Sequence, residues 1–108
     1  MLSSPPVRLL AACCLILAVL GATAPPVVVS QKNKTFSRSE IRLQVGDSLT
    51  FANNDDVSHN VFSSSAGLQF NLKRQQPGTS LSVAFQTRGT AEVRCAFHPA
   101  MKLVVVVE

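Results

Sequence analysis

"EIRLQVGDSLTF", residues 40–51, holds two alternating segments separated by a turn. Ile41, Leu43 and Val45 recur at every second position, with polar residues between them. The pair "GD" follows, and Leu49 and Phe51 then resume the alternation. Side chains of a strand point alternately to opposite faces, and glycine beside aspartate favours a turn. The stretch therefore predicts a strand, a turn and a second strand, each with one buried face.

The same features recur outward from this stretch. Leu81, Val83 and Phe85 alternate with polar or small residues, and continuous valine-rich runs occur at residues 27–30 and 102–108. Such runs are typical of strands covered on both faces or paired at a closing edge. No segment has a helical period of useful length. Residues 25–108 therefore predict a single all-β domain, an antiparallel sandwich or barrel of about seven to eight short strands.

Residues 1–24 are typical of a secretory signal peptide. Arg8 precedes the apolar run "LLAACCLILAVL" at residues 9–20, and the small residues "GATA" follow. This run is shorter than the roughly 20 residues that a membrane-spanning helix needs. We expect cleavage after Ala24, or after Gly21 because a proline follows Ala24. The mature protein is then periplasmic or otherwise exported, with no stable membrane span. "LAAC" at residues 10–13 matches a lipoprotein box only superficially, because most of the apolar run follows it.

The charge balance argues against a nucleic-acid partner. Without Arg8 the chain has nine lysines and arginines against six aspartates and glutamates, and they form no run. A nucleic-acid footprint clusters its positive charge. The chain also has no tryptophan or tyrosine on which bases would stack. The mild excess of positive charge instead favours solubility and acidic partners.

Cysteine usage poses the main question. Removal of the leader removes Cys13 and Cys14 and leaves Cys95 alone, so no internal disulfide is possible in the mature chain. Alternation places Cys95 inward, at the end of a strand. A single thiol in an exported protein has three explanations: an intermolecular disulfide, an inert buried side chain, or a metal ligand.

"CAFHPAM", residues 95–101, gathers three of the four cysteine, histidine and methionine side chains of the mature chain, namely Cys95, His98 and Met101. The fourth, His59, lies in an apolar row with a valine two positions to either side. Singly, each is more often an ordinary core residue than a ligand. Together, two imidazoles, a thiolate and a weak thioether suit copper in electron transfer. This set of ligands fits zinc less well, because structural zinc sites usually use two or more cysteines.

These residues carry a family resemblance. "CAFHPAM" resembles the short ligand loop of amicyanins within the cupredoxins, and "VGDSLTFANNDDVSHNVFSS" at residues 45–64 is similar to the segment that carries their first ligand. "SHNVF" and "HPAMK" also resemble small exported cupredoxins known as methylamine-utilisation proteins. The resemblance covers nearly the whole chain after the leader. It implies a cupredoxin-like Greek-key β-sandwich or barrel with one type 1 copper ion.

The resemblance also implies a role for each ligand. His59 and Cys95 are then the inner copper ligands, His98 the ligand whose ring edge reaches solvent, and Met101 the axial ligand. Asn60 would tie the two ligand segments together by hydrogen bonds. Phe97, Pro99 and Ala100 would form an apolar rim around His98 for brief docking of a redox partner.

The chain departs from the family pattern at two places. Many relatives have aromatic residues where this chain has Ala91 and Val93, and a glycine that commonly follows the methionine is absent after Met101. The ligands themselves are unaffected. The departures bear on core packing, redox potential and the identity of the partner.

Three classes of function compete. The first is a type 1 blue copper protein, a monomeric one-electron carrier that exchanges electrons through His98 with a transient redox partner. The second is a carrier or chaperone that binds Cu(I) and delivers it. An enzyme is the weakest alternative, because Cys95 has Arg94 and Ala96 beside it and no spare histidine exists for a further copper. No "GxSxG" nucleophile motif occurs either, so we expect no catalysis.

Overall fold

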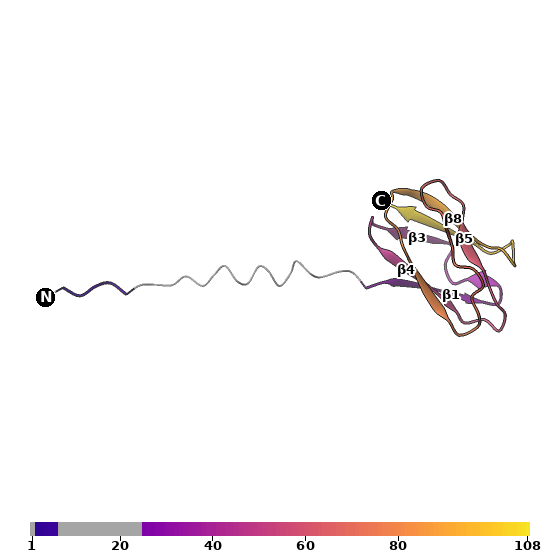
Figure 1. Ribbon diagram of the computed structural model, residues 1–108, viewed down its shortest axis with the longest axis horizontal. Coiled ribbons are helices and arrows are strands. Elements are labelled where there is room, and N and C mark those ends of the chain that lie inside the picture. Colours follow the sequence, from indigo (N-terminus) through magenta and orange to yellow (C-terminus); the bar gives the residue numbers. More distant parts are fainter. Residues whose placement is uncertain (1, 7–24) are drawn as a thin grey trace.

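The computed structural model describes residues 2–6 and 25–108. Residues 25–108 form two β-sheets that enclose one hydrophobic core (Figure 1). The four-stranded sheet has, in spatial order, β2 (Thr35–Phe36), β1 (Val27–Lys32), β4 (Ser48–Asn53) and β7 (Ser80–Ala84). The five-stranded sheet has β3 (Glu40–Leu43), β9 (Lys102–Val107), β8 (Gly89–Cys95), β5 (Val61–Ser63) and β6 (Phe70–Asn71).

The all-β prediction is confirmed, and the part of the chain that the structure describes contains no helix. Nine strands occur where about seven to eight were expected. The short strands β2 and β6 have two residues each, too few to show alternation. Among these residues no helix is long and apolar enough to span a membrane. The predicted signal peptide falls largely on residues 7–24, outside the described residues, and stays a prediction.

The prediction of an antiparallel sandwich is wrong for two strand pairs. β1 pairs with β4 in parallel, and β3 pairs with β9 in parallel. The other five pairings are antiparallel. Alternation shows which face of a strand is buried, but it does not reveal the direction of the neighbouring strand.

The opening stretch folds as a strand, a turn and a strand, as expected. Ile41, Leu43, Leu49 and Phe51 are all buried. The two strands belong to different sheets, so the turn carries the chain from one layer to the other. Gly46 makes this possible, because its φ of +95° is a conformation that side chains with a Cβ rarely adopt. Val45 was expected inside but is 44 % exposed, since β3 ends at Leu43.

The prediction of a buried face on β7 is only partly right. Phe85 is buried just beyond the strand, whereas Val83 is half-buried and Leu81 is 40 % exposed. β7 is the edge strand of its sheet. The valine-rich strands are also less covered than expected, since Val28 on β1 is 57 % exposed.

β8 aligns the ligand segments. Ala91, Val93 and Cys95 are all buried, which confirms the predicted inward face. Val61, the first residue of β5, lies opposite Cys95, the last residue of β8. The segment before β5 and the loop after β8 therefore meet at one end of the sandwich. That end lies away from the C-terminus in Figure 1.

Candidate metal centre

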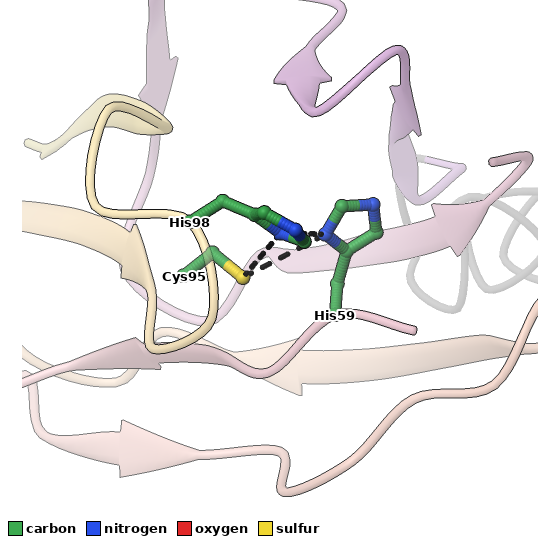
Figure 2. A group of neighbouring side chains, drawn as sticks. All are labelled: His59, Cys95 and His98. Atoms are coloured by element: carbon green, nitrogen blue, oxygen red, sulfur yellow. Dashed lines mark hydrogen bonds between the residues drawn. The ribbon is translucent and has the colours of Figure 1, made fainter. Parts of the chain in front are cut away.

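Three ligand-type atoms converge at this end of the sandwich (Figure 2). His59 comes just before β5, Cys95 ends β8, and His98 lies in the loop between β8 and β9. Cys95 Sγ is 3.6 Å from His59 Nδ1 and 3.8 Å from His98 Nδ1. The two Nδ1 atoms are 3.1 Å apart. Residues separated by 36 positions in the chain thus form one compact triangle.

The size of this triangle fits a single metal ion. Ligand nitrogens and sulfurs lie about 2.0 to 2.3 Å from a bound ion, so two of them that subtend an angle of about 100° to 130° are about 3 to 4 Å apart. All three edges of the observed triangle fall in that range. Two imidazoles and one thiolate in a trigonal arrangement suit copper.

Backbone hydrogen bonds to Gln75 hold the His59 segment in place. His59 and Gln75 form an isolated antiparallel bridge, in which His59 N donates to Gln75 O at 3.1 Å and Gln75 N donates to His59 O at 2.7 Å. His59 itself is fully buried. The fold therefore fixes the backbone of His59 and encloses its ring.

Asn60 joins the two ligand segments through its backbone. Asn60 N donates to Cys95 Sγ at 3.4 Å, and Ala96 N donates to Asn60 O at 2.9 Å. The Asn60 side chain instead donates to Asn71 Oδ1 at 2.8 Å. A hydrogen bond to a ligating sulfur tunes a metal site, because it withdraws charge from the thiolate.

Asp55 contacts the candidate site, although the sequence interpretation assigned it only to a turn. Its Oδ2 lies 3.0 Å from His59 Nε2, the ring nitrogen that faces away from Cys95. The carboxylate also accepts a hydrogen bond from the backbone N–H of Lys34, which, together with the His59 hydrogen bond, holds the pKa of Asp55 far below its ordinary value despite desolvation. In the sequence, the only indication of this contact is that Asp55 precedes His59 by four residues. The alternation of a strand does not predict that two residues at this spacing touch.

His98 is the more accessible of the two imidazoles. His98 is partly exposed, whereas His59 and Cys95 are buried. Desolvation, the neighbouring His59 ring and Lys34 together lower the pKa of His98, and Asp55 opposes them. The lowered pKa favours the neutral ring, which is the form that binds a metal.

Met101 lies in the same loop as His98. It is 2 % exposed, and its N–H donates to His98 O at 3.0 Å. This turn places Met101 inside the domain just before β9 begins. The structure thus brings the ligand-type atoms of His59, Cys95 and His98 within 3.8 Å of one another, and the axial role of Met101 stays a prediction.

The residues around His98 form an exposed rim. Phe97 is 44 % exposed, and Pro99 and Ala100 are exposed as well. The guanidinium carbon of Arg74 lies 5.4 Å from the centre of the Phe97 ring, which is within the range of a cation–π contact.

Comparisons with known proteins find copper-binding relatives. Residues 26–108 match the family described as "Copper binding proteins, plastocyanin/azurin family". Amicyanin-alpha of Methylorubrum extorquens is 33 % identical over 94 residues, which cover 84 % of this chain and 79 % of the relative. The methylamine utilization protein MauL of the same organism is 31 % identical over 64 residues, 58 % of this chain and 56 % of that protein.

Solved structures share the fold. A reduced amicyanin variant superimposes with a TM-score of 0.73 at 26 % identity, over 82 % of this chain and 88 % of that one. A copper-containing nitrite reductase from Thermus scotoductus has a TM-score of 0.72 at 22 % identity, but the match covers only 24 % of that larger chain. The two-sheet architecture described above is therefore the cupredoxin fold.

Proposed function

This chain belongs to the plastocyanin/azurin family of copper-binding proteins, and on that premise we propose that it is a type 1 blue copper protein that carries one electron at a time. The observation that supports the proposal most strongly is the triangle of Cys95 Sγ, His59 Nδ1 and His98 Nδ1. We assign the copper to these three residues, with Met101 as the weak axial ligand. Copper, when bound, supplies a one-electron couple between Cu(I) and Cu(II).

The chain's own residues have separate tasks in this proposal. The buried Cys95 and His59 exclude water from the site, because both are at most 2 % exposed. Strand ends and backbone hydrogen bonds fix the ligands, so the site changes little between the two charge states. His98 is the partly exposed ligand through which electrons enter and leave.

A visible spectrum tests this proposal. Addition of Cu(II) to the purified protein gives an intense blue colour, because a thiolate bound to Cu(II) in this ligand set absorbs strongly. Cys95→Ser abolishes the colour, and Met101→Leu keeps it while shifting the redox potential. A colourless copper complex of the unaltered protein contradicts the assignment.

The second candidate is a copper carrier that delivers Cu(I). The exposure of His98 favours it, because one ligand can be reached from outside while the other two stay buried. Voltammetry separates the two candidates. A reversible couple supports electron transfer, whereas tight Cu(I) binding without a stable Cu(II) form supports delivery.

We do not assign an enzymatic activity to the chain. It has two histidines in total, and both belong to the proposed copper site, so none remains to hold a second metal ion. The nitrite reductase that shares the fold is a larger protein, of which this chain corresponds to only 24 %.

We propose that the mature protein acts outside the cytoplasm, after removal of residues 1–24. The basic, apolar and small segments of that leader support export. N-terminal sequencing of the protein recovered from the exported fraction checks this, and a start at Pro25 or Ala22 is the expected result.

A further inference from the structure

Charge is distributed unevenly between the two ends of the sandwich. We define the site end as residues 32–38, 54–60, 73–79 and 95–102, the segments that lie where the strands adjoining the metal centre begin or end. It contains six lysines and arginines against two aspartates, a formal excess of four positive charges. Its cations are Lys32, Lys34, Arg38, Lys73, Arg74 and Lys102. The rest of residues 25–108 has three arginines against four acids.

The cations of the site end also lack acidic partners. All six are exposed, and none forms an ion pair with another described residue. Elsewhere Arg42 pairs with Glu40 and Glu108, and Arg94 pairs with Glu92. These six positive charges therefore face solvent without a paired acid. Their combined electrostatic potential attracts anionic groups.

Asp55 and Asp56 reduce this potential but do not cancel it, because they are two negative charges against six positive ones. The Asp55 carboxylate already accepts from the Lys34 backbone and lies against His59, with its side chain only 6 % exposed. Asp56 is the single exposed acid of the site end.

Three of these cations, Arg38, Arg74 and Lys102, border an apolar centre. Phe97, Pro99 and Ala100 are exposed next to His98. Arg74 lies over the Phe97 ring and so borders the apolar centre on one side. On another side, a hollow of about 230 Å³ is lined by residues 35–39 and 100–102. Arg38 and Lys102 both line this hollow, which is large enough to receive a carboxylate side chain from a partner.

We infer that the site end is a docking surface for a redox protein whose own electron port is ringed by carboxylates. This inference rests on the proposed electron-carrier function and names its partner class. A small apolar contact around His98 allows rapid release, while charge complementarity sets orientation and raises the association rate. A second copy of this chain is a poor occupant, because two surfaces of the same sign would face each other.

Binding of the metal-free protein tests the inference without depending on copper. The probes are an oxidised plant-type ferredoxin, chosen for its acidic surface, and a cytochrome c, chosen for its basic one. We expect binding to the ferredoxin that weakens as salt rises, with NMR shift changes centred on Phe97 and Arg74, and no comparable binding to the cytochrome. The blue-colour test is separate, so failure of one experiment is distinguishable from failure of the other.

Matched variants localise the effect. Lys73→Glu with Arg74→Glu, and independently Arg38→Glu with Lys102→Glu, should each weaken ferredoxin binding at least about tenfold at low salt. The control is Arg42→Glu with Arg88→Glu, which changes the net charge equally but lies away from the site end. Two separate site-end pairs guard against a variant that fails to fold.

Four results overturn the inference. The first is equal weakening by the control pair, which would show that only net charge matters. The second is absence of ferredoxin binding by the unaltered protein. The third is tighter binding to phosphatidylglycerol vesicles or duplex DNA than to the ferredoxin, which would assign the surface to a membrane or a nucleic acid. The fourth is self-association through the same residues in sedimentation experiments.

Discussion

The two ring nitrogens of His59 face different partners. Nδ1 points to Cys95 and His98, while Nε2 lies 3.0 Å from the carboxylate of Asp55. A carboxylate at Nε2 favours the tautomer with its proton there, which leaves a lone pair on Nδ1 for a metal. At the scale of single residues, Asp55 would therefore prepare His59 as a ligand of the proposed copper site.

Asp55→Asn should lower copper affinity about 10- to 100-fold while the protein still folds and turns blue. The amide keeps the size of the side chain but loses the charge that orients the ring proton. A competition titration with a Cu(I) chelator measures the change. Asp56→Asn, an exposed neighbour, is the control and should leave the affinity unchanged. Equal affinities for the Asp55 variant and the unaltered protein would remove Asp55 from the site.

The lowered pKa of Asp55 makes the stability of the metal-free protein depend on pH. Because the folded-state pKa lies below the ordinary value of 3.8, the ionised carboxylate stabilises the fold above that pH. This contribution is lost as the pH falls below 3.8 towards the folded-state pKa. Urea unfolding at a series of pH values should show a smaller acid loss of stability in Asp55→Asn than in the unaltered chain. An identical acid profile for both proteins contradicts the assignment.

At the scale of elements, one buried amide connects the ligand segment to two strands of the opposite sheet. Gln75 pairs with His59 through its backbone. Its side-chain Nε2 donates to Phe51 O on β4 and to Thr79 O, and its Oε1 accepts from Gln31 on β1. The segment that carries His59 is thus held by hydrogen bonds to β1 and β4, as well as by β5.

Gln75→Leu should destabilise the metal-free protein by about 1–3 kcal/mol, because it removes the three hydrogen bonds of the Gln75 side chain and leaves the buried Gln31 amide without its acceptor. Denaturant unfolding followed by circular dichroism measures the loss. Gln76→Leu replaces an exposed neighbour of the same type and should have little effect. If the two variants are equally stable, the buried amide does not contribute as inferred.

At the scale of the whole molecule, the metal centre joins both sides of the fold. His59 is tied to the four-stranded sheet through Gln75, whereas Cys95 ends a strand of the five-stranded sheet. The core between the sheets is made of buried aliphatic and phenyl side chains from both layers. A bound ion at this end would therefore add a further link between elements that already meet through packing and through the hydrogen bonds of Gln75 and Asn60.

Copper should raise the melting temperature of the whole domain. A ligand at 100 times its dissociation constant stabilises the folded state by about 2.7 kcal/mol. For a domain of this size, that corresponds to roughly 10 to 20 °C. Calorimetry with and without copper measures the shift. Cys95→Ser should lose most of it, and a shift retained in that variant would place the copper elsewhere.

Local pattern was enough to predict much of the site. Cys95, His98 and Met101 lie within seven residues of one another in the sequence, so their proximity follows from the sequence, and alternation correctly placed Cys95 inside. Turn chemistry was equally local, and the predicted turn at Gly46 is confirmed. The convergence of His59 with that segment was expected from the chemistry of the four residue types and from the family resemblance, because no local pattern connects His59 with Cys95.

By itself, the sequence determined that the chain folds as strands, which face of most strands is buried, and where the cysteine lies. Only the tertiary structure decided the parallel pairings of β1 with β4 and β3 with β9, the exposure of Val45, and the contact of Asp55 with His59. The physical reason is the distance along the sequence over which each feature is determined. The alternation of side chains is set by each residue's immediate neighbours, whereas strand direction and the partner of a carboxylate depend on which distant segments pack together.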